Sequence, residues 1–321
     1  MRQPLLIIPF TLLVLLSLTN VELPADNIVK AFKQIDAAAH VIRYTNELAL
    51  NHEGGHIQGV QWMEKEGKEY IVMTGSSSTY SYYTVLRRGG KQEVISVNRI
   101  LDKPYKHAGG FQINDSYMAI GIEDNEARNT SKVYVYNMAD PEQPPQQPLA
   151  IIERNGAYER ATAGSVGIMK LADKILLVVG DWSSRHLDFY IGDEQLLKGQ
   201  QANFEKVYTI SEKEADKEDW TDQEWPAYQN INLIKDAGNN IFLLGLARND
   251  KEQEVADLFK VETKDFEVFK LQKVASQQFK PKKGTSFKWG AGVVYDEKEG
   301  SMRIISSTPH MKGTSILNEY K

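Results

Sequence analysis

The sequence contains no cysteine in its 321 residues. This absence excludes disulfide bonds, thiolate metal ligands, cysteine nucleophiles and a lipid attached to a cysteine after a signal peptide. A large exported chain without disulfides is more typical of a bacterial envelope than of a eukaryotic secretory pathway. The lack of cysteine therefore limits the available chemistry and favours one kind of compartment.

The sequence also lacks the short motifs of several enzyme classes. It has no Gly-x-Ser-x-Gly segment, no Walker A loop and no dinucleotide-binding glycine fingerprint ahead of a helix. Its formal net charge is −5, and no stripe of lysine and arginine is interleaved with aromatic residues. Serine-nucleophile catalysis, phosphoryl transfer, hydride transfer and nucleic acid binding are therefore disfavoured.

Long apolar runs are scarce, and the clearest is Leu5 to Leu18, 14 residues that follow a short basic start. This length matches the apolar part of a signal peptide and is too short for a membrane span. We therefore expect residues 1–25 to be a signal peptide or N-terminal anchor and residues 26–321 to form a single domain. The mature protein is expected to be secreted or periplasmic, with no membrane span beyond that possible anchor.

The most informative feature present is a recurring pattern of four strands. A glycine-containing strand is followed by a strongly apolar strand, an aromatic or aliphatic strand, and an outer strand. Its clearest copies begin with His56-Ile-Gln-Gly-Val-Gln-Trp62 and His107-Ala-Gly-Gly-Phe-Gln-Ile113. The apolar residue after the glycine or its substitute recurs at intervals of 51, 55, 65 and 62 residues, at Val60, Phe111, Val166, Ile231 and Val293.

This spacing fits four strands plus turns per repeat, so it predicts an all-β fold, a five-bladed β-propeller with four strands per blade. The last repeat has only three candidate strands, the final one being Thr314–Tyr320. We expect His40–Asn46, near the N-terminus, to join this blade and close the ring. The organisation resembles that of five-bladed propellers in general. No named family is recognised, because the WD dipeptide and the kelch pattern are both missing.

If every inner strand runs away from one face, the loops before the inner strands and the turns after the second strands converge on that face. The candidate catalytic carboxyl groups there are Glu123, Asp124 and Asp181. The candidate ligand-binding residues are His56, His107, Gln61, Gln112, Trp182, Tyr228, Arg248, Trp289 and His310. The two glutamines recur at one offset, so each either pairs with backbone across the channel or presents its amide to a sugar.

His56 and His107 occupy equivalent positions in adjacent repeats, so their imidazoles are expected to approach one another. His52 and Glu53 belong to the same loop as His56. Neutral imidazoles beside a carboxylate are ligands for a divalent metal. The alternative is that both histidines hydrogen-bond to backbone between the blades, since their spacing matches no specific zinc motif.

A long acidic loop, Glu212–Trp225, contains seven acids, two lysines and two tryptophans. This composition suits a cation, a basic partner or a neutral glycan stacked on indole. We favour the alternative, a solvated charged loop that Trp220 and Trp225 anchor to the core.

Hydrolysis of a glycoside requires one carboxyl group as acid and another as base or nucleophile. Some five-bladed propellers are glycoside hydrolases with carboxylates around the central depression, but here the starts of the inner strands carry no acid. We therefore favour an exported binding module for a small ligand, a glycan or an envelope protein. The alternative is a glycoside hydrolase-like or metal-dependent hydrolase at the central depression.

Overall fold

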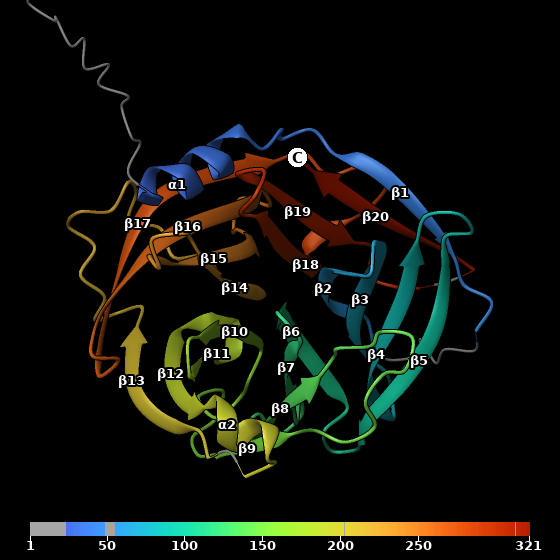
Figure 1. Ribbon diagram of the computed structural model, residues 1–321, viewed down its shortest axis with the longest axis horizontal. Helices are drawn as coiled ribbons and strands as arrows, with labels where there is room; N and C mark the ends of the chain where they lie inside the picture. The colour runs from blue at the N-terminus through green and yellow to red at the C-terminus, as the bar shows by residue number, and fades with distance from the viewer. Residues whose placement is uncertain (1–23, 49–54, 202, 312) are drawn as a thin grey trace, which may run out of the picture.

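The computed structural model describes residues 24–48, 55–201, 203–311 and 313–321. These residues form an all-β structure whose strands are arranged around a central axis, with the first strand of each set nearest the centre (Figure 1). The first 23 residues lie outside the described part, so the predicted signal or anchor is not placed. In the part that is described, no helix combines the length and apolar character that a membrane crossing requires.

Strand pairing groups the strands in antiparallel sets of four, in chain order. The first set comprises β2 (Ile57–Lys65), β3 (Lys68–Ser76), β4 (Tyr80–Arg88) and β5 (Glu93–Asp102). The second comprises β6 (His107–Asn114), β7 (Tyr117–Glu123), β8 (Thr130–Asn137) and β9 (Ala150–Asn155). The third comprises β10 (Ser165–Leu171), β11 (Lys174–Gly180), β12 (His186–Asp193) and β13 (Glu205–Ser211).

The fourth set comprises β14 (Asn230–Lys235), β15 (Ile241–Arg248), β16 (Glu254–Lys264) and β17 (Val268–Phe279). The last set joins both ends of the chain and comprises β18 (Ser286–Asp296), β19 (Ser301–Ser307), β20 (Thr314–Tyr320) and β1 (His40–Thr45). Antiparallel pairing of β1 with β20 confirms that the N-terminal strand completes the C-terminal set. This pairing covers what would otherwise be an open sheet edge.

The sheets differ in one respect from the prediction of five separate blades. A single parallel residue pair, Thr45 with Glu93, joins β1 to β5, and another, Gly110 with Ser165, joins β6 to β10. The strands therefore form two eight-stranded sheets and one four-stranded sheet in the described part of the chain. Repeat spacing in the sequence does not report such single bridges, because they depend on how closely neighbouring sets approach.

Burial follows position in each set. The second strands β7 and β11 are buried along almost their whole length, as their continuous apolar sequences require. The outer strand β9 alternates buried and exposed residues, the pattern of a strand with one solvated face.

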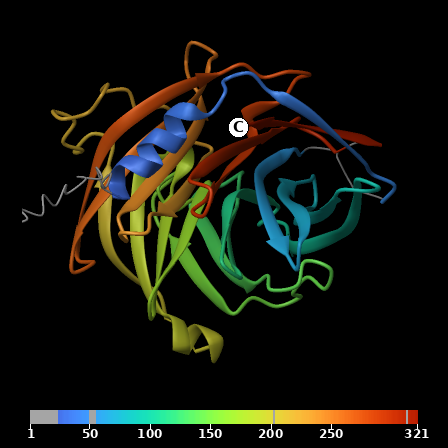
Figure 2. The ribbon, with the colours of Figure 1, turned by 45° about the horizontal axis from the view of Figure 1, so that its top comes forward.

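The helix α1 (Pro24–Gln34) precedes the closing strand and lies against β17 and β19 (Figure 2). It buries Ile28 and Phe32, and the chain directly after it buries Ile35, in a core cluster that also contains Phe279 and Tyr320. Two short helical segments, η1 (Trp182–Ser184) and α2 (Glu194–Lys198), lie at opposite ends of β12.

Side-chain amides bind the inner strands to one another across the axis. Gln112 of β6 accepts hydrogen bonds from the backbone N–H groups of Ile168 and Leu233, at 2.9 and 2.8 Å, through one oxygen. Its amide nitrogen donates to the carbonyl of Leu233 at 2.7 Å. One buried side chain thus links three inner strands, β6, β10 and β14.

A second buried amide, Asn232 of β14, also links inner strands. Its Oδ1 accepts hydrogen bonds from Nε2 of Gln61 on β2, at 3.2 Å, and from the N–H of Val293 on β18, at 3.1 Å. The strands approach so closely that a Cβ atom on Gly292 would lie 1.8 Å from the carbonyl oxygen of Val60. Glycine is therefore required there by contact between backbones.

We predict that Gln112→Leu strongly destabilises the fold. The substitution leaves buried N–H groups of Ile168 and Leu233 without their acceptor. Each unpaired buried group costs about 1–3 kcal/mol, so the free energy of unfolding should fall by about 2–6 kcal/mol. Urea denaturation measures this loss. The matched control Gln146→Leu removes an exposed amide and should change stability by no more than about 0.5 kcal/mol. Equal effects of the two substitutions would contradict a structural role of the Gln112 amide.

Candidate functional site

A pocket of about 220 Å³ lies where the inner strands β2 and β6 begin, and we call it the axial pocket. It is completed by four further segments: the turn after β7, the segment η1, the residues before β14 and the start of β18. Its lining side chains are mostly polar. They comprise His56, Gln58, His107, Glu123, Asn125, Trp182, Ser183, Tyr228, Gln229 and Lys288, with Gly164 contributing backbone.

Glu123, the last residue of β7, is the buried acid of this pocket, with only 1% of its surface exposed. Its Oε2 accepts a hydrogen bond from the N–H of Ala163 at 3.0 Å, and its Oε1 lies 3.6 Å from Nε2 of His107. Burial raises the pKa of Glu123 to about 7, although the Ala163 hydrogen bond and the positive charge of Arg128 oppose the rise. This carboxyl group therefore holds a proton up to neutral pH.

The two histidines meet as expected. Their ring centroids are 5.9 Å apart in an edge-on arrangement. Burial lowers the pKa of His107 to about 3, and burial also lowers the pKa of His56. Both imidazoles are therefore uncharged at neutral pH. His56 also contacts Gln58, whose amide nitrogen lies 2.7 Å from its Nδ1.

The hypothesis that His56 and His107 hold a metal lacks a third ligand. Within the described ranges, no group of three or more histidine, aspartate or glutamate side chains is arranged to bind a metal ion. His52 and Glu53, which the sequence places near His56, lie outside the described residues.

The other two candidate acids have different surroundings. Oδ1 of Asp124 accepts hydrogen bonds from the N–H groups of Glu126 and Ala127, at 2.9 and 3.0 Å, so Asp124 shapes the turn after β7. Asp181 lies at the end of β11 in a second pocket, of about 450 Å³, which we call the adjoining pocket. Trp182 lines both pockets and therefore separates them.

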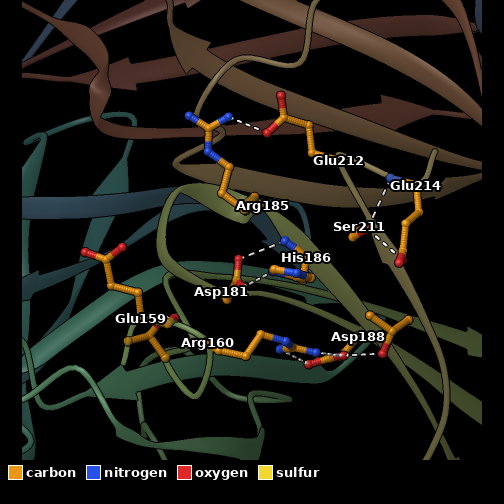
Figure 3. A network of polar contacts seen from close by, with 12 residues as sticks. Glu159, Arg160, Asp181, Arg185, His186, Asp188, Ser211, Glu212 and Glu214 are labelled. Atoms are coloured by element: carbon orange, nitrogen blue, oxygen red, sulfur yellow. Dashed lines mark hydrogen bonds and ion pairs between the residues drawn. The ribbon is translucent and has the colours of Figure 1, made fainter. Parts of the chain in front are cut away.

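In the adjoining pocket, Asp181 is paired with His186 (Figure 3). Oδ2 of Asp181 lies 2.6 Å from Nδ1 of His186, and its Oδ1 accepts the backbone N–H of His186 at 2.8 Å. The Asp181 side chain is buried, whereas the His186 side chain is 38% exposed. Burial raises the pKa of Asp181, and the hydrogen bonds from His186 limit that rise.

The wall between the pockets is stiffened by Arg128. Its guanidinium carbon lies 3.9 Å from the centroid of the Trp182 ring and its Nη1 lies 2.8 Å from Glu159. The stacked guanidinium and the ion pair hold the indole in place. One face of Trp182 is thereby covered.

The remaining sequence candidates divide into neighbours of the axial pocket and residues distant from it. Tyr228 lines the pocket, and Trp289 packs its ring 5.1 Å from that of His56. His310 follows β19 and is not among the residues that line the axial pocket. Arg248 instead pairs with Glu252 and Glu254 at 3.5 and 3.9 Å.

Gln61 and Gln112 lie at the opposite end of the axis, where they line a separate pocket of about 310 Å³. Their amides make the hydrogen bonds between inner strands described above. Gln112 pairs with backbone across the channel, as one of the two alternatives stated, whereas Gln61 pairs with the side chain of Asn232.

The tryptophans of the acidic loop are anchors in the core. Nε1 of Trp220 donates to the carbonyl of Leu271 at 3.0 Å, and Nε1 of Trp225 donates to the carbonyl of Ser184 at 2.9 Å. Both indoles are buried in the cluster that also contains Tyr228. Neither indole therefore presents a free face on which a glycan could stack.

Sequence reasoning missed Gln58, Asn125, His186 and Lys288. The spacing of Asp181 and His186 across a short turn after an apolar strand is a signal that could have identified the pair. Lys288 directly precedes the candidate Trp289, but adjacent residues on a strand normally face opposite sides. Sequence alone therefore does not place Lys288 in the pocket.

No protein-family model and no curated protein matches the chain. Solved structures do match its fold. An enzyme of glycoside hydrolase family 43 from Xanthomonas citri, complexed with xylotriose, has a TM-score of 0.50 at 12% identity, over 92% of this chain and 91% of that one. The α-L-arabinofuranosidase from Podospora anserina, in complex with cellotriose, has a TM-score of 0.50 at 8% identity, over 87% and 96%.

These matches correct the functional interpretation of the sequence. We favoured a binding module for a small ligand, a glycan or an envelope protein, and that reading is wrong. The solved structures that share the fold over most of its length are glycoside hydrolases, so they favour the stated alternative. Sequence analysis gave too much weight to the absence of acids at the inner-strand starts, because the buried acid is contributed by the end of a second strand.

We predict that Glu123 makes the stability of the protein depend on pH. Its folded pKa of about 7 exceeds its ordinary value of 4.5, so the folded state binds the proton more tightly. Stability should fall as pH rises through this window, by about 2–3 kcal/mol between about pH 5 and about pH 8. Urea denaturation of wild type and Glu123→Gln measures the difference.

The Glu123→Gln protein should lack this part of the pH dependence. The control Glu126→Gln removes an exposed acid from the same turn and should retain it, because that group has a lowered pKa and is ionised throughout the window. A wild-type slope unchanged by Glu123→Gln would show that Glu123 titrates at its ordinary pKa.

Proposed function

We propose that the protein is a glycoside hydrolase whose axial pocket binds the sugar to be released, with Glu123 as the general acid. The observation that carries this proposal is the buried carboxyl group of Glu123, whose pKa is about 7. A general acid must be protonated at the working pH and near neutral in pKa, and burial of a carboxyl group is the usual means. The shared fold with glycoside hydrolases supports the assignment.

Asp181 is the second carboxyl group that we assign to the reaction. Its charge contributes to the raised pKa of Glu123, so the two groups interact electrostatically. Glycoside hydrolysis uses such a pair, in which one group donates a proton and the other remains ionised as base or nucleophile. The hydrogen bonds from His186 hold Asp181 in one orientation and favour its ionised form.

The sizes of the two pockets support release of one terminal sugar at a time. The axial pocket, of about 220 Å³, is smaller than the range of about 300–1,000 Å³ that is common for drug-sized ligands. It therefore suits a single sugar ring. The adjoining pocket, of about 450 Å³, is reached past Trp182 and would take the rest of the chain.

The proposal includes the architecture and the compartment. We assign the antiparallel sets of four strands to the blades of a five-bladed propeller, supported by the shared fold and by the ring seen in Figure 1. Action outside the cytoplasm on glycans is supported by the signal-like segment Leu5 to Leu18.

We predict that Glu123→Gln abolishes most activity on substrates that need acid catalysis. The first substrates to test are aryl β-D-xylosides and aryl α-L-arabinofuranosides, which follow from the matched structures. For a poorer leaving group such as unsubstituted phenol, kcat/KM should fall by about 10²–10⁴, the usual contribution of a positioned acid. For a dinitrophenyl leaving group, which departs without a proton, the loss should be less than about ten-fold.

The dependence on leaving group separates a general acid from a merely structural residue. Glu126→Gln serves as the control and should retain activity on both substrates. Loss of activity to the same extent on both leaving groups would contradict the assigned role, and no hydrolysis of any aryl glycoside by the wild type would overturn the proposed function.

A further inference from the structure

Lys288 gives the axial pocket a positive charge that the rest of the site does not balance. It lines the pocket from the start of β18, and its ammonium lies 5.1 Å from the centroid of the Trp289 ring. This ammonium forms no ion pair with any described residue. The positive charge at this point contrasts with the formal net charge of the whole chain, which is −5.

The other titratable groups of the pocket leave this charge uncompensated. His56 and His107 are uncharged at neutral pH because burial lowers their pKa values. Glu123 is the acidic side chain among the residues that line the axial pocket, and its pKa of about 7 keeps it largely protonated below neutrality. An anionic ligand would therefore meet one cation and no fixed negative charge in this pocket.

A series of neighbouring rings lies between Lys288 and Glu123. Trp289, beneath Lys288, lies 5.1 Å from His56, and His56 lies 5.9 Å from His107. His107 in turn lies 3.6 Å from Glu123. Since Lys288 and Glu123 both line one pocket of about 220 Å³, a single sugar ring can contact both.

A polar group without a partner also indicates a ligand. Oδ1 of Asn125 is buried, lines the same pocket, and accepts no hydrogen bond from the described residues. Buried acceptors are normally paired. A sugar hydroxyl is a donor of the kind that this oxygen lacks.

We propose that the axial pocket binds a terminal uronic acid, with the sugar carboxylate paired to Lys288 and a ring hydroxyl donating to Asn125. In a uronic acid the carbon that bears the carboxylate and the anomeric carbon flank the ring oxygen. One ring can therefore direct its carboxylate to the cation and its glycosidic oxygen to the acid. The statement that this glycosidic bond is cleaved rests on the proposed function above.

Direct binding tests the pocket independently of turnover. Isothermal titration calorimetry of the full-length mature protein is carried out with glucuronate, galacturonate, glucose, xylose and acetate. We expect the wild type to bind at least one uronate about ten-fold or more tightly than the neutral sugars, and Lys288→Met to remove that preference. Lys288→Arg should retain most of it, because the cation remains.

The control variant is Lys298→Met. Lys298 is an exposed lysine at the far end of β18, in the turn to β19, and its substitution should leave uronate binding unchanged. The proposal is overturned if uronates bind no better than glucose and xylose, or if Lys288→Met binds them as the wild type does. It is also overturned if acetate competes as well as the uronates, since the pocket would then recognise a carboxylate without the sugar.

Turnover distinguishes the failure of this inference from that of the proposed function. Aryl glucuronides and aryl xylosides are compared for wild type, Glu123→Gln and Lys288→Met. Hydrolysis of the glucuronide that is lost in both variants supports both proposals. Uronate binding that depends on Lys288, with no hydrolysis of any glycoside, supports the pocket assignment and overturns the hydrolase. Hydrolysis of xylosides alone, unaffected by Lys288→Met, overturns the uronic acid and supports the hydrolase.

Discussion

The structure depends on hydrogen bonds that cross its axis. Apart from the single pair between β6 and β10, each inner strand pairs only with the second strand of its own set. Backbone N–H groups therefore face the axis, where an unpaired buried group is costly. One oxygen of Gln112 accepts two of these N–H groups, those of Ile168 and Leu233. The oxygen of Asn232 accepts one of them, that of Val293, together with the side-chain amide of Gln61. These amides also determine how near the strands approach, which is why a glycine occupies position 292. The ring is thus held at its centre as well as at its closing strand.

The same packing explains the electrostatics of the axial pocket. Because the amides fill the middle of the axis, the pocket is confined to the end at which His56 and His107 lie. Its groups are largely cut off from water, and burial disfavours the charged form of every group. One physical cause therefore raises the pKa of Glu123 and lowers the pKa of His107. Lys288, by contrast, is exposed although it lines the same pocket.

Sequence reasoning identified the strand sets because apolar runs and spacing report burial directly. It identified the closing strand because a blade with three strands must find a fourth at the other end of the chain. It could not distinguish an amide that pairs across the axis from one that faces a ligand, as Gln112 shows. The pairing of Asp181 with His186, and the place of Lys288, depend on side-chain directions near a turn and a strand start, which periodicity does not encode.

The histidine beside Glu123 explains how an acid at the end of a second strand remains protonated. A permanent cation 3.6 Å away would stabilise the carboxylate and lower its pKa, as Arg154 and Arg160 do for Asp188. His107 does not have this effect, because burial keeps it neutral at any pH above about 3. The starts of these two inner strands therefore carry imidazoles in place of carboxylates. Because the imidazoles are uncharged, they do not lower the pKa of Glu123. Burial of each group therefore keeps both His107 and Glu123 uncharged below neutral pH.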